Sequence, residues 1–171
     1  MSAATPAAAA PQTRPLLALD AAGQACSAAL WQPGQGLLAH RFERRARGQS
    51  KRLLPLVEAV MAQAGIAYAA LGAIAVTLGP GGFTGVRIGL AAAEGLALAW
   101  NLPILGLDSF AVVATAVPAA QREGRDLLVL IDAKRAEVYA QLRPAGAAPG
   151  EPALLAPAAL AACLPPGPLL L

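Results

Sequence analysis

The segment with the clearest chemical potential is GPGGFTGVRIG, residues 79–89, in which five glycines fall within eleven positions. Glycine is needed where backbone angles are unusual or where another backbone comes close. A turn of this kind that leads into a helix presents free amide groups and can hold an anion. We therefore predict a phosphate contact at Gly81, Gly82 and Thr84, shared with the carboxylate of Asp20.

The spacing of this turn fits neither standard nucleotide-binding motif. Val86 and Arg87 follow Gly85 where a P-loop has lysine and then serine or threonine. Thr84 stands where a dinucleotide-binding loop needs its third glycine. The turn also follows a fourth strand instead of a first one, so a Rossmann enzyme is set aside.

Other reactive side chains are sparse. His40 is the only histidine in the sequence, and Cys26 is expected to be a small buried hydrophobe, so we expect neither a metal site nor a peptidase centre. Asp20 and Asp132 each end an apolar strand-like segment. They leave open an ATPase or phosphotransferase that acts alone and positions a metal-bound nucleotide, although aspartate is also a common turn residue.

Positive charge is concentrated in residues 41–52, RFERRARGQSKR, where six basic residues accompany the single acid Glu43. The whole chain has a net charge of +3. The run is compatible with an RNA footprint and equally with a solvated loop that leads into a helix. Charge reversal of Arg44, Arg45 and Arg47, with RNA affinity measured against salt, separates these two readings.

The elements around these residues follow from hydrophobic periodicity. An antiparallel meander of three strands is predicted at 15–20, 25–31 and 37–43, followed by a helix over 53–64, capped by Ser50 and closed by Gly65. A buried strand at 71–79, the glycine turn, a helix over 86–100 and a strand at 104–107 come next. Ser109 is expected to cap a further helix, which Pro118 ends.

The second half repeats the first. Residues 16–30 align with residues 128–142, and the alignment places Asp20 over Asp132. A βββαβα unit used twice resembles the α/β fold of actin, Hsp70 and the sugar kinases. We expect a disordered leader at 1–14, a first actin-like subdomain at 15–107, and a linker helix with an incomplete second subdomain at 108–171. The chain stops where another core strand should begin, which favours truncation.

Small residues recur every fourth position along the helix after the glycine turn, at Gly85, Gly89, Ala93 and Ala97. Such a stripe lets a helix approach its neighbour closely. Two interpretations are open: the stripe packs on the protein's own sheet, or it is the docking face for a second chain.

The order of LLALDAAGQACSAALW, TLGPGGFTGVRIGLAAAEGLALAW and VLIDAKRAEVYAQL resembles the TsaB family, the YeaZ-type subunits of the bacterial machinery that places threonylcarbamoyl on adenosine 37 of tRNA. The resemblance spans about residues 15–143. It implies a noncatalytic subunit with the duplicated actin-like fold that pairs with the transferase TsaD. It further implies a TsaE-like ATPase in the complex, tRNA bound through the complex, and a homodimer when the subunit is isolated. No cofactor is required, although ATP or ADP at the complex interface fits the family.

In the family, pairing uses helices that correspond here to residues 51–64 and 85–99. The resemblance thus assigns the interface to the apolar side of the first helix and to the small-residue stripe, namely Leu53, Val57, Met61, Gly85, Gly89, Ala93 and Ala97.

Three positions depart from the family pattern. Gly82 stands where serine is frequent, Ala21 and Ala22 replace hydroxyl residues, and Gln49 replaces a common histidine. The missing hydroxyl groups weaken the case for phosphate binding at the first hairpin.

Membrane proteins are excluded as a class despite a hydrophobic fraction of 57%. No uninterrupted apolar run reaches the ~18 residues of a membrane span, and the opening residues lack the pattern of a signal peptide. The expected compartment is the cytoplasm.

Overall fold

A computed structural model describes residues 14–45, 47–134, 136–160, 162, 164 and 169–170. Residues 1–13 of the predicted leader lie outside the described residues.

The first half forms a five-stranded sheet in the order β3-β2-β1-β4-β5. Its strands are β1 (Leu16–Asp20), β2 (Ala25–Gln32), β3 (Gly36–Arg44), β4 (Ala73–Gly79) and β5 (Ile104–Asp108). β1 pairs antiparallel with β2 and parallel with β4. The predicted meander and the fourth and fifth strands are therefore confirmed.

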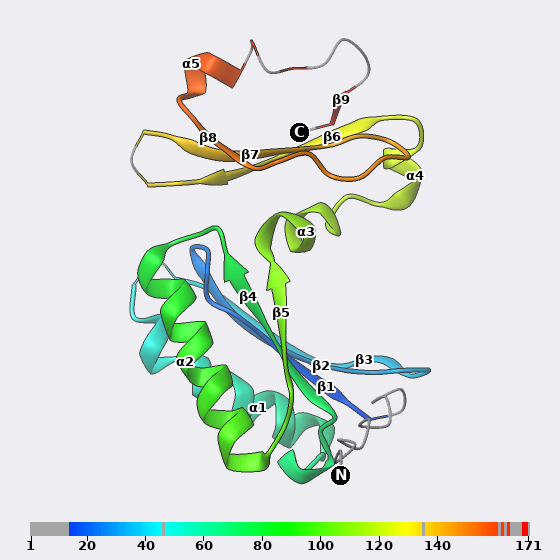
Figure 1. Cartoon of the computed structure of the whole chain (residues 1–171). Coiled ribbons are helices and arrows are strands. Elements are labelled where there is room, and N and C mark those ends of the chain that lie inside the picture. Colours follow the sequence, from blue (N-terminus) through cyan, green and yellow to red (C-terminus); the bar gives the residue numbers. More distant parts are fainter. Residues whose placement is uncertain are drawn as a thin grey trace, which may run out of the picture.

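Two helices cover one face of this sheet, α1 (Leu53–Ala64) and α2 (Phe83–Trp100) (Figure 1). Short 3-10 helices precede and follow α1, η1 (Gln49–Lys51) and η2 (Tyr68–Ala70). Ser50 was predicted to cap α1, but it lies inside η1, and the cap position is Arg52 without a side-chain bond. Gly65 does close α1, with a φ of 64°. α2 begins three residues earlier than predicted, inside the glycine-rich turn.

The second half forms a four-stranded sheet in the order β8-β7-β6-β9 (Figure 1). Its strands are β6 (Asp126–Asp132), β7 (Val138–Arg143), β8 (Ala153–Leu155) and β9 (Leu169–Leu170). β6 pairs antiparallel with β7 and parallel with β9, as β1 does with β2 and β4. Asp20 and Asp132 are each the last residue of the first strand of their sheet, as the predicted internal repeat requires.

Three short helices complete the described chain, α3 (Ser109–Ala114), α4 (Ala119–Arg122) and α5 (Pro157–Leu160). α3 lies between the two sheets and contacts β6 of the second sheet and β4 and β5 of the first, with Phe110 in a small second core (Figure 1). The cap of α3 is Asp108, whose carboxylate accepts from the N–H groups of Phe110 and Ala111. The prediction of Ser109 as the cap was wrong by one residue.

β5 is an edge strand of the first sheet, and all five of its residues are exposed, including Ile104, Leu105 and Leu107. Its hydrogen bonds go to β4 on one side. Within the described part of the chain, no helix combines the length and the apolar character needed to cross a membrane.

Candidate functional site

The carboxylate of Asp20 organises the turn between β1 and β2. Its Oδ1 accepts a hydrogen bond from the Thr77 hydroxyl at 2.5 Å and another from the N–H of Ala22 at 3.1 Å. Thr77 is buried on β4, the parallel neighbour of β1. The carboxylate therefore ties the first turn to the sheet.

The glycine-rich turn packs its backbone directly on the β1–β2 turn. The N–H of Gly82 donates to the carbonyl of Ala22 at 2.7 Å. A Cβ atom on Gly85 would lie 2.0 Å from the carbonyl oxygen of Ala21, and one on Gly81 would lie 2.6 Å from that of Ala22. A Cβ on Gly82 would meet one atom only, at 3.4 Å, so the serine frequent there in the family has room. Gly81 and Gly85 are thus needed for contact between two backbones.

The residues predicted to contact phosphate lie near one another but do not line one cavity. Asp20 lines a cavity of about 120 Å³ together with Ser109. Gly81 and Gly82 line a larger hollow of about 540 Å³, opposite the β6–β7 hairpin. Thr84 is exposed on the first turn of α2. Phosphate binding by this set stays a prediction.

Ser109 is a polar group of the small cavity that sequence reasoning missed as a site residue. Its side chain is only 6% exposed, and its Oγ has no hydrogen-bond partner within the described residues. A serine next to a helix start is usually a cap. The sequence pattern therefore did not indicate that Ser109 lines the same cavity as Asp20. The cavity therefore offers a carboxylate and an unpaired hydroxyl to a small polar molecule.

In the turn between β6 and β7, the carboxylate of Asp132 is bound by Lys134 of the same turn. The ammonium of Lys134 lies 2.6 Å from Oδ2 of Asp132, and the N–H of Lys134 donates to Oδ1 at 2.7 Å. These hydrogen bonds lower the pKa of Asp132. Asp132 does not line the cavity that holds Asp20. Among the described residues, no group of three histidine, cysteine or acidic side chains is placed to hold a metal. The geometry gives no support to the ATPase alternative.

Two substitutions separate an anchoring role of Asp20 from a charge role. We expect Asp20→Ala to lower the free energy of unfolding by roughly 1–3 kcal/mol, because it leaves the buried Thr77 hydroxyl and the Ala22 amide without their acceptor. Asp20→Asn keeps the Oδ1 acceptor, so we expect it to retain most of that stability. Denaturant unfolding of both variants tests this, and an equal loss would contradict the anchoring role.

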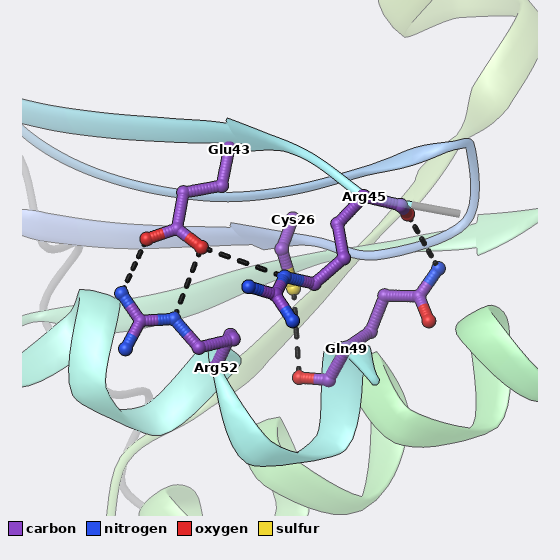
Figure 2. A network of polar contacts seen from close by, with 5 residues as sticks. All are labelled: Cys26, Glu43, Arg45, Gln49 and Arg52. Carbon is purple, nitrogen blue, oxygen red and sulfur yellow. Dashed lines mark hydrogen bonds and ion pairs between the residues drawn. The ribbon is translucent and has the colours of Figure 1, made fainter. Parts of the chain in front are cut away.

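The basic run is partly neutralised by its own acid. Arg52 forms a two-pronged ion pair with the Glu43 carboxylate, with Nε at 3.0 Å from Oε2, and Arg45 adds a longer contact of 3.7 Å (Figure 2). The buried Gln49 holds the loop, because its Nε2 donates to the carbonyl of Arg45 at 3.1 Å. Its own carbonyl accepts a contact from the Cys26 thiol at 3.7 Å. The run is therefore an ordered loop, and the hydrogen bonds of Gln49 fix its conformation.

The thiol of Cys26 is buried and unreactive. Its side chain is fully buried, and burial raises the pKa of Cys26, so the thiol remains protonated at neutral pH. This agrees with the prediction of a small buried hydrophobe and gives no nucleophile for a peptidase.

The ion pair of Glu43 predicts acid sensitivity. The hydrogen bond from Arg52 lowers the pKa of Glu43 below its ordinary value of 4.5, so the pair stabilises the fold above pH 4.5. That contribution is lost as the pH falls below 4.5 and through the lower folded value. We expect Glu43→Gln to flatten this part of the stability curve, measured by urea unfolding from pH 6 down to pH 3. An unchanged slope would contradict the role of the pair.

The small-residue stripe packs on the protein's own sheet. Gly85, Gly89, Ala93 and Ala97 are the buried residues of α2, and a Cβ on Gly89 would lie 3.4 Å from Val76 of β4. On α1 the three predicted contact residues, Leu53, Val57 and Met61, are likewise buried in the core. These seven side chains are therefore covered within the subunit itself, and their assignment to a partner interface stays a prediction.

The opposite side of α2 carries the exposed residues. Phe83, Arg87, Ala91, Glu94 and Leu98 follow one another at spacings of three or four and are all exposed, so they lie on one face; we call them the outer stripe. Phe83 is 70% exposed with the guanidinium of Arg87 3.7 Å from its ring centre, and Leu98 is 88% exposed. Two apolar side chains thus flank a polar middle on the free face of α2.

Comparison with known proteins identifies the family of this chain. The model of the family "TsaD: tRNA N6-adenosine threonylcarbamoyltransferase" matches residues 38–161. The chain belongs to the TsaD/TsaB family. The tRNA threonylcarbamoyladenosine biosynthesis protein TsaB of Escherichia coli is 41% identical over 72% of this chain and 52% of its own length. TsaB of Haemophilus influenzae is 36% identical over 75% and 53%, respectively.

A solved structure supports the same assignment. A Pseudomonas aeruginosa protein described as similar to the peptidase YeaZ superposes with a TM-score of 0.75 at 36% identity, covering 84% of this chain and 67% of that one. The actin-like duplicated fold of the TsaD/TsaB family, predicted from the repeat, is confirmed. The chain spans about half the length of the curated TsaB relatives that it matches.

Proposed function

We propose that this chain is a noncatalytic subunit that pairs with a TsaD-type transferase in the transfer of threonylcarbamoyl to adenosine 37 of tRNA. The observation that carries the proposal is the match to two proteins named for tRNA threonylcarbamoyladenosine biosynthesis over 72% and 75% of this chain. A subunit of this machinery works where tRNA is modified, in the cytoplasm. A TsaE-like ATPase and tRNA join through the assembled complex.

The chemistry of the described residues supports a noncatalytic role. His40 is the only histidine of the sequence, so the chain lacks the metal-binding histidines that the family resemblance assigns to TsaD. Asp20 and Asp132 are both engaged with neighbours of their own chain. We therefore propose that this chain acts by offering a binding surface to the transferase.

The outer stripe on α2 is the surface that we propose for pairing. The small-residue stripe packs α2 on the sheet, and the outer stripe is therefore held in a fixed position. Exposed aromatic side chains and arginines, here Phe83 and Arg87, are enriched at protein–protein interfaces. In the absence of the transferase, the same surface provides for a homodimer.

The direct test mixes the purified chain with a TsaD-type transferase and measures the mass of the product by size-exclusion chromatography with light scattering. We expect a complex of defined stoichiometry at micromolar concentration. Two proteins that elute separately at every ratio would contradict the proposal. ATP hydrolysis by the chain alone, lost in Asp20→Asn, would instead favour the independent ATPase.

A further inference from the structure

Three arginines converge on one hollow of the second half, far from the glycine-rich turn in the sequence. Arg122, Arg125 and Arg143 line a hollow of about 620 Å³ beside α4. Glu123 is the single carboxylate among the residues that line it. The hollow therefore has a local excess of positive charge.

A tight turn places two of these arginines side by side. Glu123 has φ −55° and ψ 116°, Gly124 has a φ of 66°, and the N–H of Arg125 donates to the carbonyl of Arg122 at 2.9 Å. These values define a type II turn, which requires a residue such as glycine at its third position. The chain then enters β6, where Leu127 pairs with Arg143 of β7. Strand pairing thus brings the third arginine to the same place.

Two of the three guanidinium groups, those of Arg122 and Arg143, are held in position without being neutralised. Nε of Arg122 donates to the carbonyl of Val117 at 2.9 Å, and Nη1 of Arg143 donates to Oε1 of Gln141 at 2.7 Å. The adjacent acid Asp126 is engaged elsewhere, because its Oδ1 accepts from the N–H of Ala145 at 2.9 Å. Across the described residues, the ion pairs are formed by other side chains and none involves these arginines.

We propose that this hollow binds a phosphate group. A guanidinium presents a planar fork of donors that matches phosphate oxygens, and the two forks of Arg122 and Arg143 that are fixed in advance lose little freedom on binding. The lining has no aromatic side chain among the described residues, so a nucleobase would find no stacking partner. The site thus recognises the phosphate itself, either free or in the backbone of a nucleic-acid strand. It is independent of the pairing proposed for α2.

The test titrates the whole chain with a labelled oligouridylate, followed by fluorescence anisotropy, and with inorganic phosphate, followed by NMR shifts of the arginine Nε–H groups. Arg125→Ala is the main variant, since Arg125 forms no side-chain hydrogen bond or ion pair with the described residues. Arg14→Ala removes the same charge from an exposed residue that lies outside both the hollow and the outer stripe, and it is the matched control. Thermal melting of each variant checks that the fold is intact.

We expect Arg125→Ala to weaken binding roughly three- to tenfold and to reduce the salt slope by about one, with Arg14→Ala close to the parent. Glu123→Gln should strengthen binding, because it removes the only carboxylate of the hollow. Weakening for both ligands identifies a free-phosphate site, and weakening for the oligonucleotide alone identifies a phosphodiester site. Equal affinities of Arg125→Ala, Arg14→Ala and the parent for both ligands would overturn the proposal.

Discussion

Replacing Gly85 by alanine is expected to lower the free energy of unfolding by about 3 kcal/mol, the upper part of the range for overpacking a well-filled site. The added Cβ would lie 2.0 Å from the carbonyl oxygen of Ala21, so a backbone segment must move. For a chain of this length the loss corresponds to a drop in Tm of roughly 6–12 °C. Differential scanning calorimetry measures it.

Gly95 supplies the matched control in the same helix. It is exposed, and a Cβ there would meet nothing within 4 Å. Gly95→Ala is therefore expected to stabilise the protein by roughly 0.5–1 kcal/mol, because alanine restricts the unfolded chain and favours the helix. Similar Tm values for the two variants would contradict the close backbone contact and reopen a ligand-binding role for the turn.

Replacing Leu98 by aspartate is expected to raise the Kd for a TsaD-type partner by at least about tenfold while leaving the Tm nearly unchanged. Leu98 projects from the outer stripe with 88% of its surface exposed, so the folded subunit loses little when it is changed. In a complex, the same change would place a carboxylate in an apolar contact, which is costly without a partner charge. Isothermal titration calorimetry gives the affinity.

Two controls make this result specific. Leu37→Asp introduces the same charge at an exposed leucine on β3, outside the outer stripe, and should leave pairing intact. Ala93→Arg forces a long side chain into the buried stripe and should unfold the subunit before pairing can be measured. If Leu98→Asp and Leu37→Asp behave alike, the outer stripe is not the pairing surface.

Much of the fold was predictable because it rests on local patterns. The meander, α1 with its closing Gly65, and β4 followed by α2 all follow from periodicity and turn residues. The internal repeat was visible because Asp20 and Asp132 each end a strand, and the pairing of the second sheet confirms it.

The roles of individual site residues depended on contacts that spacing does not encode. Glycine spacing showed an unusual turn, but not that the carbonyl of Ala21 presses against Gly85. The small-residue stripe had two possible neighbours, and only the position of the sheet decides between them. Arg125 and Arg143 are 18 positions apart in the sequence and line the same hollow because β6 pairs with β7, which no local motif indicates.

The exposed edge strand β5 has a practical consequence for handling the protein. An unpaired strand edge with apolar side chains is a template on which another strand can add, and such growth has no natural stopping point. Assembly through β5 should therefore give species of increasing size whose amount rises with time and temperature. A helix-mediated dimer instead reaches equilibrium at once and reverses on dilution. Light scattering followed over hours distinguishes the two.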